Sequence, residues 1–142
     1  MSLFDHVLEK KSPETVIAIV GASGNPTKYG YIIPRELQRH GYTLLLVNPR
    51  GGVLEGLGLT ALRSVNELPR GVSLVNVVTP PEVTVEVLAE CAAAGLTRIW
   101  LQPGSFDDVV LQEAASLRTP AGDRLEVESD ACIMVVAART AR

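Results

Sequence analysis

Five short runs of apolar residues in this chain do not alternate with polar ones. They consist largely of Val, Ile, Leu and Ala, and strands of this kind are typical of a sheet whose two faces are both covered by helices. The pattern therefore predicts buried parallel strands over Val16–Val20, Thr43–Val47, Leu74–Val78, Arg98–Leu101 and, more weakly, Leu125–Val127.

The segments between these strands carry apolar residues at helical spacing. Glycines stand just after two of them, at Gly41 and Gly95, as is common at helix C-termini. The predicted helices cover Arg35–His40, Glu82–Ala94 and Phe106–Leu117, with one or two helical turns near Ser64–Leu68 and a short helix over Ser2–Lys10 outside the sheet.

Pro34 falls at the start of the first long helix. Because proline lacks an N–H, it fits best in the first turn of a helix. We expect either a helix that starts late, with Pro34 in its first turn, or a kink at this residue.

The order of strands and helices indicates the fold class. Strand and helix alternate along all 142 residues, which favours parallel strands joined by right-handed crossovers. We therefore expect an α/β, Rossmann-like doubly wound parallel sheet of about five main strands, with helices on both faces, forming one domain over residues 1–142.

Composition excludes several classes of partner. The net charge of −3 provides no basic surface for nucleic acid, and no apolar run reaches the ~18 residues of a membrane span. The charged start, Met1–Lys11, is unlike a secretory signal. Cys91 and Cys132 form no CxxC pair, so we expect a reduced, cytoplasmic protein.

The loop after the first strand has the composition of a phosphate-binding turn. Glycine at the strand end permits a tight turn, and small residues allow a phosphate to approach backbone N–H groups and the helix N-terminus. The alternative is a plain strand-to-helix turn, and the spacing is not that of a Walker motif. The candidate ligand-binding residues here are Gly21, Ala22, Ser23, Gly24, Asn25, Pro26 and Lys28. We expect Gly21→Val to abolish binding in a folded domain.

The loop after the second strand, Asn48-Pro49-Arg50, lacks the acidic residue with which NAD-binding folds hold the ribose. Arg50 instead suits a phosphorylated ribose, as found in NADP or coenzyme A. The alternative is that Arg50 is a solvated turn residue.

Two further loops follow predicted strands, at Thr79-Pro80-Pro81 and at Gln102-Pro103. Ligands of open α/β sheets collect at these carboxyl ends of the strands, and prolines provide stiff apolar walls there. The same prolines are also good helix-start residues.

These motifs together resemble the stand-alone CoA-binding domain proteins, relatives of the nucleotide-binding domain in the succinyl-CoA synthetase α subunit. The matching pieces run in order along nearly the whole chain: Val20-Gly21-Ala22-Ser23 with Asn25-Pro26, Gly41-Tyr42, Val47-Asn48-Pro49, Thr79-Pro80-Pro81-Glu82, Ile99-Trp100-Leu101-Gln102-Pro103-Gly104 and Asp130-Ala131-Cys132-Ile133-Met134-Val135.

The resemblance implies ligand contacts at specific positions. By this likeness Ser23, Gly24, Asn25 and Pro26 line the first loop, Arg50 lies close to a basic residue of the synthetase, and Leu101, Gln102 and Pro103 match its ligand-contacting loop. Two departures stand out. The segment Val78-Thr79-Pro80 is neutral where many members are basic, and Ala131 replaces an Arg that commonly precedes the cysteine.

No Ser/His/Asp set, carboxylate pair or metal-ligand cluster is expected at the loop ends. Cys132 follows the last strand, where a redox role competes with simple burial, and Cys91 fits helix packing. The sequence therefore favours a ligand-binding module over an enzyme. Its expected ligand is a small molecule, coenzyme A or an acyl-CoA, and its sequence identifies no protein partner.

Two other functions stay open. A small NADP-dependent oxidoreductase would need a catalytic Tyr/Lys pair or a second domain, and Tyr29 and Tyr31 lie too near the first loop to serve. An interaction scaffold with an empty site is the third possibility.

Overall fold

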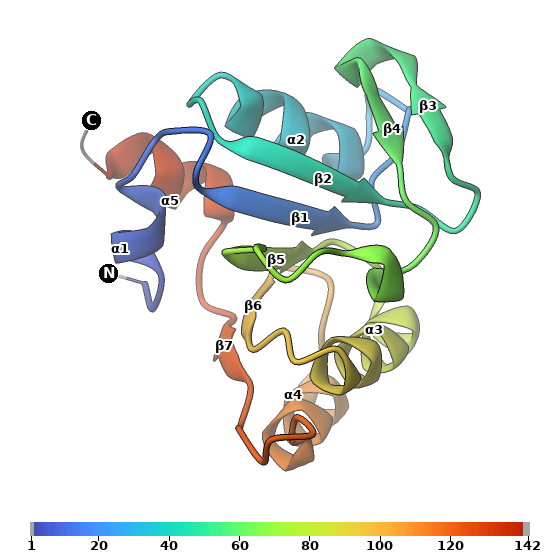
Figure 1. The fold of residues 1–142 in the computed structure, drawn as a ribbon, viewed down its shortest axis with the longest axis vertical. Coiled ribbons are helices and arrows are strands. Elements are labelled where there is room, and N and C mark those ends of the chain that lie inside the picture. Colours follow the sequence, from blue (N-terminus) through green and yellow to red (C-terminus); the bar gives the residue numbers. More distant parts are fainter. Residues whose placement is uncertain (1, 141–142) are drawn as a thin grey trace.

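A computed structural model of the chain describes residues 2–140. Its main sheet has five parallel strands in the order β2-β1-β5-β6-β7 (Figure 1). The strands are β1 (Val16–Val20), β2 (Thr43–Val47), β5 (Leu74–Val77), β6 (Arg98–Leu101) and β7 (Glu126–Glu128). The predicted doubly wound α/β fold is confirmed.

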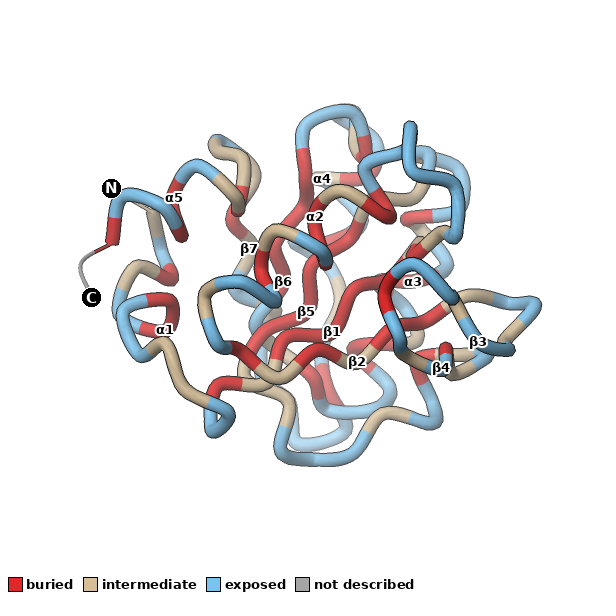
Figure 2. The backbone as a smooth tube through the Cα atoms, turned by 90° about the horizontal axis from the view of Figure 1, so that it is seen from above, coloured by how far each residue is buried: buried red, intermediate tan, exposed pale blue. Residues whose placement is uncertain are grey.

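Helices cover both faces of this sheet, and the strands between them are largely buried (Figure 2). On one face, side chains of α1 (Asp5–Leu8), α2 (Tyr29–Gln38) and α5 (Ile133–Arg139) pack against Ile17, Ile19 and Trp100 of the sheet. On the other face, α3 (Pro81–Ala93) and α4 (Asp108–Ser116) cover a layer rich in valine. None of the helices described within residues 2–140 is long and apolar enough to cross a bilayer.

Several elements differ from the sequence-based expectation. The N-terminal helix is shorter than Ser2–Lys10, and the turn near Ser64–Leu68 is a 3-10 helix over Val65–Glu67. An antiparallel hairpin of β3 (Gly52–Leu54) and β4 (Leu59–Ala61), closed by a 3-10 turn at Glu55–Leu57, and helix α5 were not predicted. Strands of three residues are too short to show an alternating pattern. The α5 sequence is rich in valine, which favours strands.

Helix α2 begins earlier than the predicted start near Pro34. It starts at Tyr29, so Pro34 is inside the helix and the late start is wrong. In a regular helix the N–H of residue 34 would bind the carbonyl of Gly30. Proline has no N–H, and the Gly30 carbonyl accepts a hydrogen bond from the Ser23 amide instead (3.1 Å). The proline therefore leaves an acceptor free for the loop after β1.

The first turn of α2, which contains Gly30, is in close contact with the loop after β1. A Cβ atom on Gly30 would stand 2.1 Å from the carbonyl oxygen of Gly21, so the residue has no room for a side chain. Gly21 itself has φ +100°, a conformation that glycine adopts readily. Two glycines therefore allow the helix start and the strand end to touch.

We expect Gly30→Ala to destabilise the protein by about 3 kcal/mol or more, because the methyl group would overlap a backbone carbonyl that cannot rotate away. The matched control is Gly24→Ala in the same loop, whose Cβ would lie 3.7 Å from Leu54 Cδ2, an ordinary contact. Urea unfolding of the two variants compares them. Equal unfolding midpoints for Gly30→Ala and the parent would contradict this account.

Candidate functional site

The order of the strands creates a crevice between β1 and β5. From β1 the chain crosses to β2 on one side, and it later returns to β5 on the other side of β1. The loops that follow β1 and β5 therefore diverge at the carboxyl edge of the sheet. In open α/β sheets, ligands bind at this topological switch point.

Two adjoining cavities occupy this edge. The outer cavity, about 630 Å³, lies between the loops after β1 and β5, and the inner cavity, about 440 Å³, lies between the loop after β6 and the start of α5. Tyr29, Val78 and Gly104 line both cavities, so the two form one continuous cleft.

The cleft collects most of the predicted ligand-binding residues. The outer cavity is lined by eight of them: Gly21, Ala22, Ser23, Lys28, Asn48, Thr79, Pro80 and Pro81. The inner cavity adds Gln102 and Pro103. Outside both linings lie Gly24, Asn25, Pro26, Pro49, Arg50 and Leu101.

Most backbone amides of the first loop are already bonded within the protein. The amides of Gly21 and Ala22 both donate to the carbonyl of Val47, at 3.1 and 3.2 Å. The Ser23 amide donates to the carbonyl of Gly30. The amides of Asn25, Thr27 and Lys28 donate within the loop, to the Ser23 hydroxyl, the Asn25 side chain and the Asn25 carbonyl respectively. These amides are therefore engaged within the protein and are not free donors for a phosphate.

The start of α2 offers the donors that the loop does not. The amides of Tyr29 and Gly30 precede the first intrahelical bonds, and in the described chain neither donates to another protein group. Both residues line the outer cavity. The positive end of the ten-residue helix and the Lys28 side chain stand beside them, which suits an anion.

Gly21 is needed for the fold itself, whereas the Gly21→Val prediction assumed that the variant stays folded. A Cβ atom at this residue would lie 2.8 Å from Val78 Cγ2, and its φ of +100° disfavours any side chain. Valine would therefore strain the fold itself, and the variant cannot report on binding alone.

The Asn48 side chain connects the loop after β2 to the loop after β1 by hydrogen bonds. Its Nδ2 donates to the carbonyl of Ala22 (2.7 Å), and its Oδ1 accepts from the Arg50 amide (2.8 Å). The Arg50 side chain is exposed at the rim, next to the β3–β4 hairpin. Neither function expected of Arg50, phosphate ligand or solvated turn residue, is decided by this position.

Thr79, Pro80 and Pro81 build the opposite wall and also start α3. Pro80 is the N-cap and Pro81 the first helical residue, as the helix-start interpretation predicts. The Thr79 hydroxyl lies 2.8 Å from the hydroxyl of buried Thr84, which fixes the loop against the helix.

Gln102 ties the end of β6 to α5. Its Oε1 accepts from the Ile133 amide (2.8 Å), and its Nε2 lies 3.4 Å from Cys132 Sγ. Its backbone carbonyl accepts the Ser105 hydroxyl (2.7 Å). Leu101 is fully buried in the α3–α4 layer, and it lines neither cavity.

Eight further residues line the cleft that were not among the predicted ligand-binding residues, although Thr27 stands in the predicted loop and Cys132 was a candidate for a redox role. They are Thr27, Tyr29, Gly30, Val78, Gly104, Ser105, Cys132 and Met134. A prediction that started the helix at Tyr29 would have placed Tyr29 and Gly30 in the cleft. Glycine at the start of such a helix often marks a place where the helix packs closely against the preceding strand. Val78 carried no signal, since it continues an apolar strand pattern.

The two cysteines have opposite environments. Cys91 is a fully buried residue of α3, and burial raises the pKa of its thiol to about 12. It therefore stays protonated and inert, as helix packing predicts. Cys132 is half-buried in the wall of the inner cavity.

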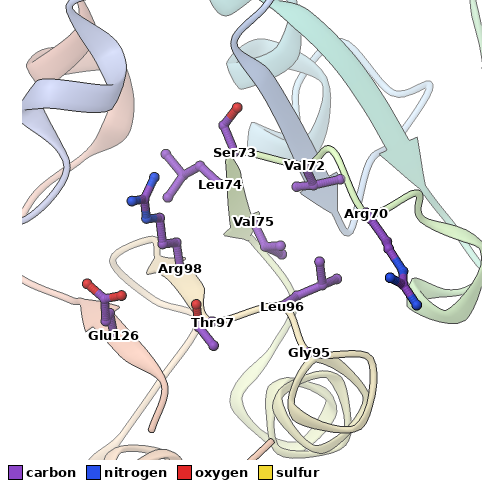
Figure 3. A pocket seen from close by; sticks show the side chains of 10 residues that line it. All are labelled: Arg70, Val72, Ser73, Leu74, Val75, Gly95, Leu96, Thr97, Arg98 and Glu126. Atoms are coloured by element: carbon purple, nitrogen blue, oxygen red, sulfur yellow. The ribbon is translucent and has the colours of Figure 1, made fainter. Parts of the chain in front are cut away.

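A further cavity of about 300 Å³ opens at the opposite edge of the sheet (Figure 3). Arg70 and Arg98 line it, but their side chains point away from one another, and Glu126 lies at the same mouth. The helix that meets this edge, α3, ends there, so it presents carbonyls and not amides. An anionic ligand is favoured at the carboxyl edge instead.

Comparison with known proteins finds relatives with CoA-related names. The α subunit of ADP-forming acetate–CoA ligase I from Pyrococcus furiosus is 32% identical over 97 residues, covering 66% of this chain and 21% of that subunit. The chain thus spans about a fifth of the length of this curated relative. The uncharacterized protein YneT from Bacillus subtilis is 31% identical over 124 residues, covering 87% of this chain and 86% of YneT.

The fold has close counterparts among solved structures. A conserved hypothetical protein from Pyrococcus furiosus superposes with a TM-score of 0.73 and 38% identity, covering 85% of this chain and 97% of that one. The model of a family described as "CoA binding domain" matches residues 15–138. The resemblance inferred from the motifs is confirmed, and the chain belongs to the CoA-binding domain family.

Proposed function

We propose that the chain binds coenzyme A or an acyl-CoA in the cleft at the carboxyl edge of the sheet. The observation that carries this proposal is the division of the cleft into two parts. The outer cavity offers the N-terminus of α2 and Lys28, and the inner cavity is lined by apolar groups of Val78, Pro103 and Met134. CoA has the same division, because its charged phosphates lead into a less polar arm.

In this arrangement the diphosphate lies at the start of α2. The amides of Tyr29 and Gly30 donate to it, and the Lys28 ammonium neutralises part of its charge. The arm then passes Tyr29, an exposed aromatic residue at the junction of the cavities, and ends near Cys132.

The family assignment and the names of the ligase relatives favour CoA over NADP. We propose a binding module without complete catalytic machinery of its own. The polar side chains nearest the inner cavity, Gln102 and Ser105, already hold the protein together. The reaction class of the longer relatives is not assigned to this chain.

We expect Lys28→Ala to weaken CoA binding about five- to tenfold, because a charge-assisted bond to phosphate is lost at a partly solvated position. Isothermal titration calorimetry at low salt measures the loss, and higher salt should reduce the difference. The control is Lys10→Ala, which removes an exposed lysine paired with Glu14 away from the cleft. Equal losses in both variants would show that Lys28 contributes only to net charge.

Thiol alkylation tests the inner cavity. Iodoacetamide should modify Cys132, and saturating acetyl-CoA should slow that reaction because the arm covers Sγ. Mass spectrometry locates the label. Cys91→Ala should leave both the reaction and its protection unchanged, and Cys132→Ala should remove the reaction. Alkylation of Cys132 at the same rate with and without acetyl-CoA would place the arm elsewhere.

A double-mutant cycle tests Arg50 as the partner of the ribose phosphate. Dephospho-CoA should bind the parent about tenfold more weakly than CoA, since it lacks one charge-assisted bond. Arg50→Ala should lose affinity for CoA but barely for dephospho-CoA, so that the two ligands converge. If the two losses simply add, Arg50 does not contact this phosphate and Lys28 is the next candidate.

A further inference from the structure

Asn76 is an unexplained polar residue in the core. It is fully buried in β5, between Ile19 of β1 and Trp100 of β6. Within residues 2–140, its Nδ2 and Oδ1 are the buried side-chain nitrogen and oxygen atoms that have no hydrogen-bond partner. The indole N–H of Trp100, the residue that pairs with Asn76 on β6, donates to the carbonyl of Ala131.

A buried amide without partners lowers stability, because it loses its hydrogen bonds to water and gains none in return. The neighbours of Asn76 on the strand are valines, and an apolar side chain would suit the position better. Packing therefore does not account for an asparagine here, and a buried polar group without a partner requires an explanation, of which function is one.

The position of Asn76 relates it to the cleft. Side chains alternate along a strand, so Asn76 faces the same side as Leu74 and Val78, toward α2 and α5. Val78, two residues further, lines both cavities. The Cα atom of Asn76 therefore lies about 6.6 Å along the strand from that of Val78, and the two side chains share one face of the sheet.

Two polar side chains that line the inner cavity, Gln102 and Ser105, already make hydrogen bonds within the protein. The Gln102 side chain is engaged by Ile133 and Cys132, and the Ser105 hydroxyl donates to a carbonyl. The arm of CoA contains secondary amides, and burying them among apolar groups without partners would weaken binding. Asn76 offers the donor and the acceptor that such an amide requires.

We propose that Asn76 binds an amide of the CoA arm, an inference that rests on the proposed function. The Met134 side chain lines the inner cavity and packs against the same core layer as Leu74. Methionine is unbranched and adapts readily. Its rotation, with that of Val78, extends the inner cavity to Asn76 when the ligand enters. Asn76 thus selects ligands that carry the arm over nucleotides that do not.

The test compares CoA with adenosine 3′,5′-bisphosphate, which lacks the arm, by titration calorimetry on Asn76→Leu. We expect CoA affinity to fall about tenfold or more and bisphosphate affinity to stay unchanged. The unfolding midpoint in urea should not fall, because the variant removes an unpartnered amide. The control is Asn66→Leu at an exposed position, which should bind both ligands like the parent.

Unchanged CoA affinity in Asn76→Leu, or an equal loss for both ligands, would overturn the inference while leaving the proposed function intact. If the parent binds neither ligand, the proposed function fails and this inference with it. Should Asn76→Leu not fold, NMR of the parent decides. The side-chain amide signal of Asn76 should shift with CoA and not with the bisphosphate, and a signal indifferent to CoA would refute the contact.

Discussion

The contact between the first turn of α2 and the loop after β1 determines the geometry of the cleft. Pro34 leaves the Gly30 carbonyl without a helical donor, and the Ser23 amide takes that place. Gly30 has no side chain to hold the loop away. The N-terminus of α2 is therefore brought to the edge of the sheet, with its first amides beside the crevice between β1 and β5.

The side chains around the cleft divide into those that build it and those left for a ligand. Asn48 and Gln102, both expected to bind the ligand, hold loops and helix starts together. Their bonds fix the walls before any ligand arrives, which reduces the ordering that binding requires. In the proposed function, the groups left for the ligand include the start of α2, Lys28 and the apolar inner wall.

Much of the fold could be predicted because its strands are buried on both faces. Such strands appear as continuous apolar runs, as in Val16–Val20, and their order with the helices indicates the doubly wound class. The hairpin at Gly52–Ala61 could not be predicted in this way, since its short strands pack at the rim. Helix α5 was hidden by its valines, whose local preference is overruled by packing on Trp100 and α1.

For the candidate site, position was more predictable than role. The carboxyl ends of the strands could be located from the pattern, and most residues named there do line the cleft. The sequence could not show which polar atoms remain available to a ligand. Hydrogen bonds such as that from the Ser23 amide to the Gly30 carbonyl form only once the folded chain brings the two residues together. Asn76 was missed because one polar residue within an apolar run does not show whether it has a partner.

The use of backbone groups at the start of α2 has a consequence for how this architecture can diverge. An amide N–H is present whatever side chain the residue carries, except in proline. Substitutions at Tyr29 alter the shape of the cleft but leave its main-chain donors in place. Sequences can therefore drift widely around such a site, provided that the few positions without room for a side chain stay glycine.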